Sequence, residues 1–521
     1  MKDKNKTRLK IFPLTLNKSN VSKSKMRRTI VFGGQAGTGP NILTKVLGEV
    51  LVKKGYFVFY SRDYESLIRG GHNFNTLTFS EEEVYSNDSK TDLLVCLDDL
   101  TKKKHSKDLN KGGIILEGEH QNMWFAGAIF KILGLDFADL EKELKILEKR
   151  FDENIKEAKE GYSKFEKKIN LEKPNFTKRN FSNGNQGITE GAIKSGLEVY
   201  YAYPMTPATP VMDELAKVQE KNNFLVLELE NEIAVANAGV GSCIVGAKGM
   251  VGTSGGGFDL MTETLSLTGI ANVPLVFYLC SRPGPATGVA TYTSQGDLKL
   301  AINAGHGEFN RVVLVPGDPV EAEELTNQAF YFSHKFGIPS IIVGDKHLAE
   351  SLYTTNEKPF LVKVPSKTKL KRFNSYETDL NGSATEDPEI IKKNVLLRNK
   401  VGEEVKKETK NFIRYKIYGK KASKNVVVCF GSVIGAVLDA TKELDVKVIQ
   451  ILYIEPFAVG VEKELKGNLI LVENDSRGSL ADLIGEKTCI KIEEKNKILR
   501  FDGRPFFADE LKEEIRRKLK K

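Results

Sequence analysis

Three loops of this chain contain the side chains that could take part in chemistry. The first loop, residues 203–209, reads Tyr-Pro-Met-Thr-Pro-Ala-Thr and follows an apolar run. Its two prolines fix φ and donate no backbone hydrogen bond, so the loop is stiff and presents the hydroxyl of Thr206 in a fixed direction. That hydroxyl can donate to a carboxylate or a carbonyl of a substrate. A rigid turn without any ligand explains the same residues equally well.

The second loop is acidic. Glu228, Glu230 and Glu232 follow an apolar run and precede a stretch rich in Ala and Gly, residues 234–246. Glutamates in the first turn of a helix can simply complement the helix dipole. Small residues also permit close packing, however, and we expect one of these carboxyls to be drawn into the interior. A carboxyl in such a place can share a proton with a ligand nitrogen.

The third set of residues is a glycine triplet and an arginine. Thr253 and Ser254 precede three glycines that begin at Gly255, and Arg282 lies within Ser-Arg-Pro-Gly-Pro-Ala-Thr-Gly at 281–288. Consecutive glycines let a flat ligand approach the backbone. An arginine between rigid neighbours suits bidentate recognition of a carboxylate. A surface ion pair is the alternative for Arg282, and the rigidity of its loop argues against it.

The elements around these loops predict an α/β fold. Apolar runs alternate with helix-length stretches, a pattern typical of a largely parallel sheet with helices on both faces. The strands predicted in this region are Val199–Tyr201, Phe224–Leu227, Leu275–Cys280, Val312–Val315 and Ser340–Val343. Open sheets of this type bind ligands beyond the carboxyl ends of their strands. All three loops follow such runs.

The beginning of the chain predicts a second α/β pattern. A strand over 29–32, a glycine-rich loop over 33–39, a helical pattern and a strand over 56–60 together form a βαβ unit. The glycine loop can bind a phosphate group at the start of the helix. Its glycines do not follow the G-x-G-x-x-G order, and a tight turn needs no ligand, so both interpretations stay open. Residues 139–168 predict one charged amphipathic helix.

Composition divides the chain into several doubly wound α/β domains joined by polar segments. The predicted segments are a basic flexible tail (1–28), a first α/β domain (29–172), a linker (173–185), a second α/β domain (186–365), a linker (366–412) and a third α/β domain (413–521). The third domain has strands predicted near 425–430, 446–451 and 469–472.

Charge and hydropathy exclude several classes of protein. The net charge is +9, and residues 1–28 alone contain ten Lys or Arg and one Asp, so the remaining chain is balanced. A balanced body argues against a nucleic-acid-binding protein. No run of about 18 apolar residues could span a membrane, and the basic tail lacks the apolar core of a secretory signal. The tail slightly resembles a transit peptide, but a solvated tail is favoured.

Cysteine spacing argues against a metal centre in this chain. The five cysteines are scattered, without a C-x-x-C pair or a histidine at ligand spacing. Local zinc and iron–sulfur sites are therefore not expected. Unpaired cysteines in apolar runs favour a reducing compartment.

These motifs, in this order and spacing, resemble the α subunit of the 2-oxoacid:ferredoxin oxidoreductases, which depend on thiamine diphosphate. The motifs are Tyr-Pro-Met-Thr-Pro-Ala-Thr, Glu-Asn-Glu-Ile-Ala, Gly-Thr-Ser-Gly-Gly-Gly-Phe-Asp-Leu-Met and Ser-Arg-Pro-Gly-Pro-Ala-Thr-Gly. The first domain, with Gly-Gly-Gln-Ala-Gly-Thr-Gly-Pro and Ile-Arg-Gly-Gly-His-Asn at 68–73, resembles the γ subunit of the same enzymes. The closing Asp-Gly-Arg-Pro-Phe at 502–506 resembles their transketolase-like C-terminal domain. The resemblance extends from residue 29 to the end.

The resemblance implies roles for individual residues and a fold for each domain. The second domain would be of the type that binds the pyrimidine of thiamine diphosphate, with Glu232 pairing with N1′ of the aminopyrimidine. The cofactor-binding residues would be Glu232, Thr253, Ser254 and Gly255, and the substrate-binding residues Thr206 and Arg282. Two positions depart from the family: Asn231 stands where an aspartate is usual, and Met205 where isoleucine is common.

The chain lacks the Gly-Asp-Gly…Asn pattern that holds Mg²⁺ and diphosphate in thiamine enzymes, and it lacks cysteines at cluster spacing. The resemblance therefore implies a separate β subunit that carries Mg²⁺, the diphosphate site and a 4Fe–4S cluster. The expected reaction is a cytoplasmic oxidation of a 2-oxoacid with coenzyme A to acyl-CoA, CO₂ and reduced ferredoxin. The alternatives are a non-catalytic nucleotide-binding or scaffold protein on the same fold and a self-sufficient thiamine decarboxylase or transketolase. The sequence does not select the 2-oxoacid.

Overall fold

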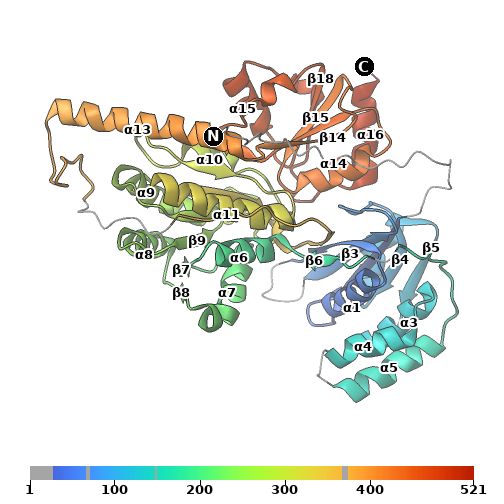
Figure 1. Cartoon of the computed structure of the whole chain (residues 1–521). Coiled ribbons are helices and arrows are strands. Elements are labelled where there is room, and N and C mark those ends of the chain that lie inside the picture. Colours follow the sequence, from blue (N-terminus) through green and yellow to red (C-terminus); the bar gives the residue numbers. More distant parts are fainter. Residues whose placement is uncertain (1–26, 66–70, 147–149, 176, 366–373, 521) are drawn as a thin grey trace, which may run out of the picture.

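The described residues form three sheets with helices packed against them (Figure 1). The computed structural model describes residues 27–65, 71–146, 150–175, 177–365 and 374–520. Most of the predicted tail therefore lies outside the described residues. Its last two residues are tied to the body, because Arg27 Nη1 lies 2.9 Å from Asp439 Oδ2 and Arg28 Nη1 lies 3.3 Å from Asp92 Oδ1.

The first sheet has the strand order β5-β4-β1-β3-β2-β13-β6. Its elements from the first domain are β1 (Arg28–Gln35), α1 (Pro40–Lys53), β2 (Phe57–Asp63), β3 (His72–Ser80), β4 (Thr91–Cys96), α2 (Asp99–His105) and β5 (Leu109–Glu117). The predicted βαβ unit is present, but β3 lies between β1 and β2 and runs antiparallel to both. The sheet is therefore mixed.

Three helices complete the first domain: α3 (Asn122–Leu133), α4 (Phe137–Ile146) and α5 (Phe151–Ser163). The single helix predicted over 139–168 is wrong, because α4 and α5 are separate helices. Arg150 immediately before α5 has φ 50°, which an α-helix cannot contain. Helices α3 and α5 touch backbone to backbone: a Cβ on Gly127 would lie 1.9 Å from the carbonyl oxygen of Ala158.

Two short strands from later in the chain extend the first sheet. Strand β6 (Asn180–Ser182) falls in the predicted linker, and β13 (Leu352–Thr355) comes at the end of the second domain. Strand β13 pairs antiparallel with both β2 and β6. Strands from the linker and from the second domain therefore complete the first sheet. This strand pairing joins the first two domains.

The second sheet has the order β17-β11-β12-β10-β9-β7-β8, and all its strands except β17 are parallel. The strands are β7 (Val199–Ala202), β8 (Leu225–Glu228), β9 (Gly249–Thr253), β10 (Val276–Ser281), β11 (Val312–Leu314), β12 (Ser340–Asp345) and β17 (Tyr453–Glu455). The helices are α6 (Gly184–Lys194), α7 (Thr209–Asn222), α8 (Glu232–Ile244), α9 (Gly255–Ala271), α10 (Leu298–Asn303), α11 (Pro319–Phe336) and α12 (Lys346–Glu350). The five predicted strands are confirmed.

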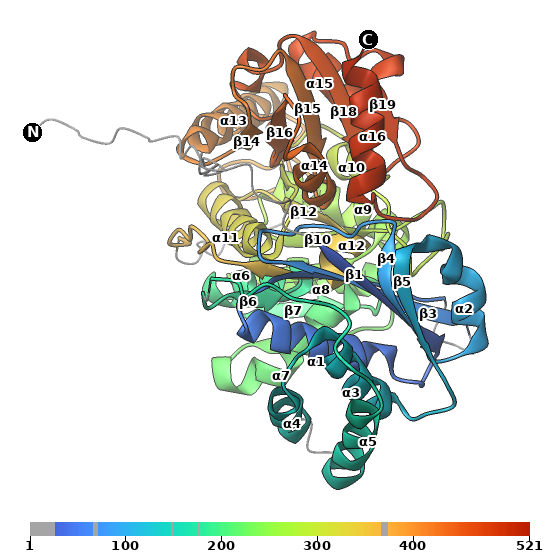
Figure 2. The ribbon, with the colours of Figure 1, turned by 90° about the vertical axis from the view of Figure 1, so that its right-hand side faces the viewer.

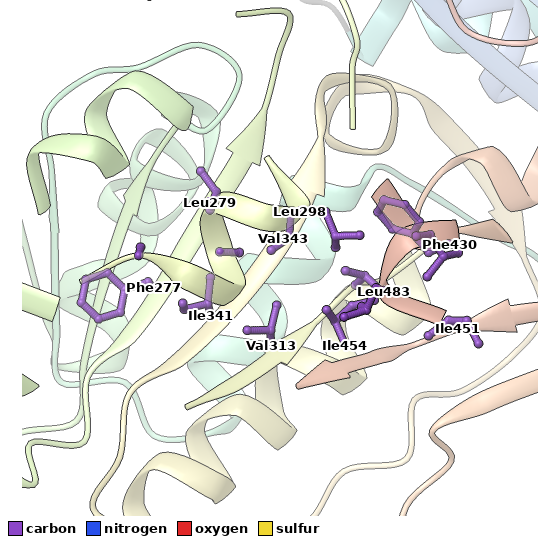
Figure 3. Packing of buried hydrophobic residues seen from close by; sticks show 14 of the residues in the cluster. Phe277, Leu279, Leu298, Val313, Ile341, Val343, Phe430, Ile451, Ile454 and Leu483 are labelled. Atoms are coloured by element: carbon purple, nitrogen blue, oxygen red, sulfur yellow. The ribbon is translucent and has the colours of Figure 1, made fainter. Parts of the chain in front are cut away.

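The central strands of this sheet are buried on both faces, as is typical of a parallel sheet covered by helices. Along β10, Phe277 and Leu279 face one core cluster, whereas Val276 and Tyr278 face another. The first cluster continues into the third domain through Phe430 and Leu483, and in Figure 3 Leu298 and Val343 lie between these two residues and Leu279. The sheet therefore forms the centre of the molecule and gives its strand ends a rigid frame.

The third sheet has the order β14-β16-β15-β18-β19. Its elements are β14 (Tyr415–Gly419), β15 (Asn425–Phe430), α14 (Val433–Thr441), β16 (Lys447–Ile451), β18 (Asn468–Glu473), α15 (Ser479–Thr488), β19 (Lys497–Leu499) and α16 (Ala508–Leu519). The stretch predicted as a polar connection, 366–412, contains helix α13 (Pro388–Glu408). This helix buries only Val405 fully, so its apolar signal is weak.

The third domain also contacts the first. In Figure 2 the helices α14 and α16 lie above the strands of the first sheet. The Ser89 hydroxyl donates to Asp509 Oδ2 at 2.6 Å, and the backbone N–H of Tyr85 donates to Asp439 Oδ2 at 2.9 Å. Among the described residues, no helix is long and apolar enough to cross a membrane.

Candidate active site at the carboxyl ends of β7 to β10

The predicted chemical loops gather at one edge of the second sheet. They follow β7, β8, β9 and β10, which are neighbours in the order β10-β9-β7-β8 and all run in the same direction. Because carboxyl ends of parallel strands meet at one edge, the four loops share one region.

Glu232 is the carboxyl that enters the interior. It is the first residue of α8 and is 6% exposed, whereas Glu228 and Glu230 are exposed. Asn231 caps the helix by accepting a hydrogen bond from the N–H of Ala234 at 2.9 Å. Asn231 thus satisfies one of the free N–H groups at the start of α8, as an aspartate at this position also could.

The glycine triplet lets this carboxyl approach helix α9. A Cβ on Gly257 would lie 2.7 Å from Glu232 Oε1 and 2.2 Å from the hydroxyl oxygen of Thr253. A Cβ on Gly256 would meet only the carbonyl oxygen of Ala286, at 3.7 Å, so this glycine is less crowded than Gly257. The first turn of α9 thus offers free backbone N–H groups beside a buried carboxyl, an arrangement that suits a flat polar ligand.

Arg282 joins the β10 loop to the β7 loop. Its side chain is largely buried, and Nη1 donates to the carbonyl oxygen of Thr206 at 2.7 Å. Burial lowers the pKa of the guanidinium, and the carboxylates of Asp297 and Glu232 act in the opposite direction. The backbone of Thr206 therefore positions Arg282, and the side chain of Thr206 is half-buried.

Several buried polar atoms of this region have no partner among the described residues. They are Ser254 Oγ, Ser281 Oγ, Arg282 Nε and Asp297 Oδ2. Buried polar groups are nearly always hydrogen-bonded, so a cluster of exceptions indicates a place for water or a ligand. The Thr253 hydroxyl makes only a 3.4 Å contact with the Ser254 carbonyl oxygen.

Sequence reasoning missed Asp297 as a site residue. The tripeptide Gly296-Asp297-Leu298 differs from the magnesium motif of thiamine enzymes, and no local pattern marks it as functional. The structure places the Asp297 carboxyl against the start of α9: a Cβ on Gly255 would lie 2.7 Å from Asp297 Oδ2. Burial raises the pKa of this carboxyl.

The tight turn before α1 accounts for the glycine loop of the first domain without a ligand. Gly39 precedes α1 with φ 95°, a conformation that favours glycine, and Pro40 begins the helix. The Thr38 hydroxyl and N–H both donate to the carbonyl oxygen of Gln35, at 2.8 and 3.1 Å. These bonds close a tight turn. The possibility that the loop also binds a phosphate stays a prediction.

The histidine motif of the first domain is only partly described, because residues 68–70 lie outside the described residues. His72 is buried and its Nε2 lies 2.8 Å from Nε2 of His105. Burial lowers the pKa of His105 to about 4, and it also lowers the pKa of His72. Within the described part of the chain, no group of His, Cys, Asp and Glu residues could hold a metal ion.

Two segments of the chain match models of known protein families. Residues 190–415 match the family "Pyruvate flavodoxin/ferredoxin oxidoreductase, thiamine diP-bdg", and residues 29–120 match "Pyruvate ferredoxin/flavodoxin oxidoreductase". The chain is 26% identical to the 2-oxoacid:ferredoxin oxidoreductase subunit alpha of Sulfolobus sp, over 94% of this chain and 96% of that protein. It is 27% identical to the 2-oxoglutarate synthase subunit KorA of Methanocaldococcus jannaschii, over 64% of this chain and 98% of the relative.

A solved structure has the same fold over nearly the whole chain. It is the 2-oxoglutarate:ferredoxin oxidoreductase from Magnetococcus marinus with 2-oxoglutarate, coenzyme A and succinyl-CoA bound. The TM-score is 0.82 at 22% identity, and the match covers 95% of this chain and 100% of the other. The arrangement of all three sheets is therefore shared with that protein.

Proposed function

Because this chain belongs to the 2-oxoacid:ferredoxin oxidoreductase family, as an α subunit with a γ-type domain at its N-terminal end, we propose that it supplies half of a thiamine-dependent active site. The proposed reaction converts a 2-oxoacid and coenzyme A to acyl-CoA, CO₂ and reduced ferredoxin. The observation that carries the proposal is the approach of the buried Glu232 carboxyl to the first turn of α9, where only glycine at position 257 leaves room for it.

The residues at this edge fit the aminopyrimidine end of thiamine diphosphate. Glu232 would hold a proton between its carboxyl and N1′ of the ring. Thr253, Ser254 and Gly255 would lie along the ring, where the unpartnered Ser254 hydroxyl and the free N–H groups of α9 offer hydrogen bonds. When bound, the cofactor supplies the carbon nucleophile and accepts the electron pair left by decarboxylation.

Arg282 and Thr206 would bind the carboxylate and carbonyl of the substrate. The guanidinium is fixed by its bond to the Thr206 carbonyl oxygen, so its remaining donors are oriented before the substrate arrives. A planar donor set of this kind matches a carboxylate on two oxygens. Buried surroundings strengthen the attraction, because they exclude the water that would screen it.

The surface around the site supports a partner subunit. Large apolar side chains of the segments that flank the site are 40–50% exposed, namely Leu227 on β8, Ile233 on α8, Leu260 on α9 and Val289 after β10. Exposed apolar side chains near a polar site are typical of protein interfaces. We assign this surface to a β subunit that would carry Mg²⁺, the diphosphate site and a 4Fe–4S cluster, with ferredoxin as the electron acceptor.

The substrate class proposed is pyruvate or 2-oxoglutarate. The family descriptions name pyruvate, whereas the Methanocaldococcus relative and the Magnetococcus structure are named for 2-oxoglutarate. The five cysteines are free thiols, which supports a reducing compartment and hence a cytoplasmic enzyme.

The proposal is tested by reconstitution. The chain and its β subunit are purified together and assayed with pyruvate, 2-oxoglutarate and branched 2-oxoacids, in the presence of coenzyme A and a low-potential acceptor. We expect acyl-CoA formation that requires both subunits and thiamine diphosphate. The matched control is the same complex with Asp213→Asn, an exposed change on α7 that leaves the site intact. A correctly assembled complex that turns over none of these acids would refute the proposal.

A further inference from the structure

The motif Asp-Gly-Arg-Pro-Phe at 502–506 carries part of the family resemblance but forms no part of the candidate site. It lies between β19 and α16 in the third domain. The N–H of Arg504 donates to Asp502 Oδ1 at 2.9 Å. Gly503 between them has φ 77°, a conformation that favours glycine. The motif therefore begins with a tight turn, which sets the direction of the Arg504 side chain.

This turn packs against the segment that follows β10, residues 283–293, which we call the site loop. The N–H of Thr293 donates to the carbonyl oxygen of Gly503 at 3.1 Å. A Cβ on Gly503 would lie 3.2 Å from Cβ of Tyr292 and 3.8 Å from Cγ of Pro283. Pro283 is the residue next to the proposed substrate-binding arginine. The third domain thus contacts both ends of the site loop.

The side chain of Arg504 joins the site loop to the first domain. Its Nη2 donates to the hydroxyl of Tyr292 at 3.2 Å, and its guanidinium carbon lies 4.0 Å from the centre of the Tyr292 ring. Its Nη1 donates to Asp63 Oδ1 at 3.3 Å, at the end of β2. A guanidinium that both stacks on a ring and hydrogen-bonds to it holds that ring in one orientation.

A buried bond makes a second link between the first domain and the site loop. The hydroxyl of Thr291 donates to the carbonyl oxygen of Tyr64 at 2.6 Å. The three consecutive residues 291–293 are therefore each bonded to another domain, Thr291 to the first and the other two to the third. The end of the site loop is held from two sides.

The middle of the site loop reaches the candidate site. A Cβ on Gly256 would meet the carbonyl oxygen of Ala286 at 3.7 Å, so the loop extends to the first turn of α9. Its middle residues are exposed. The N–H of Val289 donates to the carbonyl oxygen of Pro283 at 3.0 Å, which closes the loop on itself. Because the loop is closed in this way, a contact that fixes its ends also fixes its middle.

We infer that Arg504 is a positioning residue: through Tyr292 it holds the site loop, and with it Arg282, in the orientation that receives the 2-oxoacid. The inference rests on the proposed function. Arg504 would contact neither substrate nor cofactor. A loop without this contact must be ordered when the substrate binds, and that ordering costs entropy. Loss of Arg504 should therefore weaken binding of the 2-oxoacid more than it slows the chemical step.

The test is Arg504→Met in the reconstituted complex. We expect KM for the 2-oxoacid to rise about ten-fold, the effect of one charge-assisted bond, with kcat changed less than about two-fold. The dissociation constant of thiamine diphosphate should not change. The contact with Asp63 is lost as well, so the melting temperature of the complex should fall.

Lys442→Met is the matched control for that loss of stability. Lys442 also lies in the third domain and donates to the first, at the carbonyl oxygen of Glu83, and its side chain is 30% exposed against 34% for Arg504. Its described contacts are with Glu83, Tyr85 and Asp439, none of which belongs to the site loop. We expect a lowered melting temperature with KM as in the wild type.

Tyr292→Phe isolates the link between Arg504 and the site loop. It removes the hydroxyl that accepts from Arg504 and keeps the ring and the contact with Asp63. We expect KM to rise about three-fold with the melting temperature nearly unchanged. The double variant with Arg504→Met should raise KM no further than Arg504→Met alone, because both changes remove the same link. Additive effects on KM would show that Arg504 does not act through Tyr292 and would overturn the inference.

Hydrogen exchange of the full chain follows the loop without any need for activity. Peptides that contain the N–H groups of Val289 and Thr293 should exchange faster in Arg504→Met than in the wild type, because the loop opens more often. The same peptides should exchange at the wild-type rate in Lys442→Met. Unchanged exchange in Arg504→Met would contradict the inference.

The outcomes are distinct. A wild-type complex without activity on any 2-oxoacid refutes the proposed function itself. An active wild type with an unchanged KM in Arg504→Met, or with the same rise of KM in Lys442→Met, refutes only the positioning role. If Arg504→Met does not assemble, Tyr292→Phe decides: a raised KM at a native melting temperature supports the inference, and an unchanged KM overturns it.

Discussion

Two neighbouring strands of the second sheet end in the same way but are used differently. Strands β10 and β12 pair in parallel up to Ser281 and Asp345, and each is followed by a buried cation, Arg282 or Lys346. Lys346 donates to the carbonyl oxygen of Arg62 and lies 3.8 Å from Asp63 Oδ1 and 3.9 Å from Glu350 Oε2. Arg282 has one hydrogen bond and an unsatisfied Nε.

The first domain accounts for the difference. Its strand β2 reaches the end of β12, where Arg62 Nε lies 2.9 Å from Glu350 Oε2 and the Tyr64 hydroxyl donates to Glu350 Oε1 at 2.9 Å. Arg504 of the third domain adds a contact of 3.3 Å to Asp63 Oδ1. These groups satisfy one another, so the end of β12 forms a joint between domains. The end of β10 keeps unsatisfied polar atoms at Ser281 and Arg282, and there we propose that a ligand binds.

The comparison shows how a buried charge can be interpreted. A buried cation that protein groups surround stabilises the assembly of the domains. A buried cation beside unsatisfied hydroxyls and an unsatisfied carboxylate indicates a binding site for a ligand or for a partner subunit. Arg282 and Lys346 occupy equivalent positions in the sheet, and the groups around each cation distinguish their roles.

Three substitutions test this difference between the candidate site and the domain contact at the end of β12. Of these, Glu232→Gln should have the largest effect, which is on kcat. The amide can still hydrogen-bond the ring nitrogen of the cofactor but cannot share a proton, and such groups contribute about 10²–10⁴-fold to the rate. We expect kcat of the reconstituted complex to fall by about that factor, with thiamine binding nearly unchanged. Native turnover in the mutant would show that Glu232 does not share a proton with the cofactor, and Glu230→Gln would be measured next.

Lys346→Met should act on stability and not on chemistry. Removing one member of a buried ion cluster leaves Asp63 and Glu350 without part of their compensation, and we expect a loss of about 3 kcal/mol in the free energy of unfolding. Denaturant unfolding of the complex measures this loss. Lys299→Met is the control, because its pair with Asp482 is half exposed and should contribute less than about 1 kcal/mol.

If Lys346→Met lost substrate affinity but kept its stability, the proposed difference between Lys346 and Arg282 would be wrong. The end of β12 would then take part in substrate binding as well as in the contact between domains.

Arg282→Lys should give the smallest of these effects and the opposite pattern to Lys346→Met. Lysine keeps the charge but cannot present the planar pair of donors. We expect kcat/KM for the 2-oxoacid to fall about ten- to a hundred-fold, as for one charge-assisted bond of about 1.5–3 kcal/mol, with stability and thiamine binding retained. Steady-state kinetics beside a cofactor titration measure it. Weakened thiamine binding with native kcat/KM at saturating cofactor would assign Arg282 to the cofactor or to the subunit interface.

Much of the fold follows from local patterns in the sequence. The apolar runs of β10, β11 and β12 are buried on both faces, so they stand out without knowledge of their neighbours. The runs of β7 and β8 are also apolar in sequence, although Leu225 and Leu227 of β8 are exposed. Strand β9 gives a weaker local signal, because two of its five residues, Gly249 and Gly252, are glycines. Gly252 is needed because a Cβ there would lie 2.0 Å from the Tyr200 hydroxyl oxygen. A tertiary contact thus weakens the local signal of the strand that precedes Thr253.

The candidate site is predictable to the same extent. Thr206, Glu232, Ser254 and Arg282 lie in loops that follow strands, and parallel strands bring such loops together. Asp297 does not directly follow a strand but stands at the start of the short helix α10, so the pattern of loops after strands does not mark it. The joint at Lys346 is equally hidden, because its partners are about 280 residues away in the first domain.

The account depends most directly on one claim, that this chain holds only the aminopyrimidine half of a shared cofactor site. Calorimetric titration of thiamine diphosphate with Mg²⁺, into the purified chain and into its complex with the β subunit, tests that claim. We predict weak binding to the chain alone and tight, Mg²⁺-dependent binding to the complex. Tight, Mg²⁺-dependent binding to the chain without a partner would contradict the account.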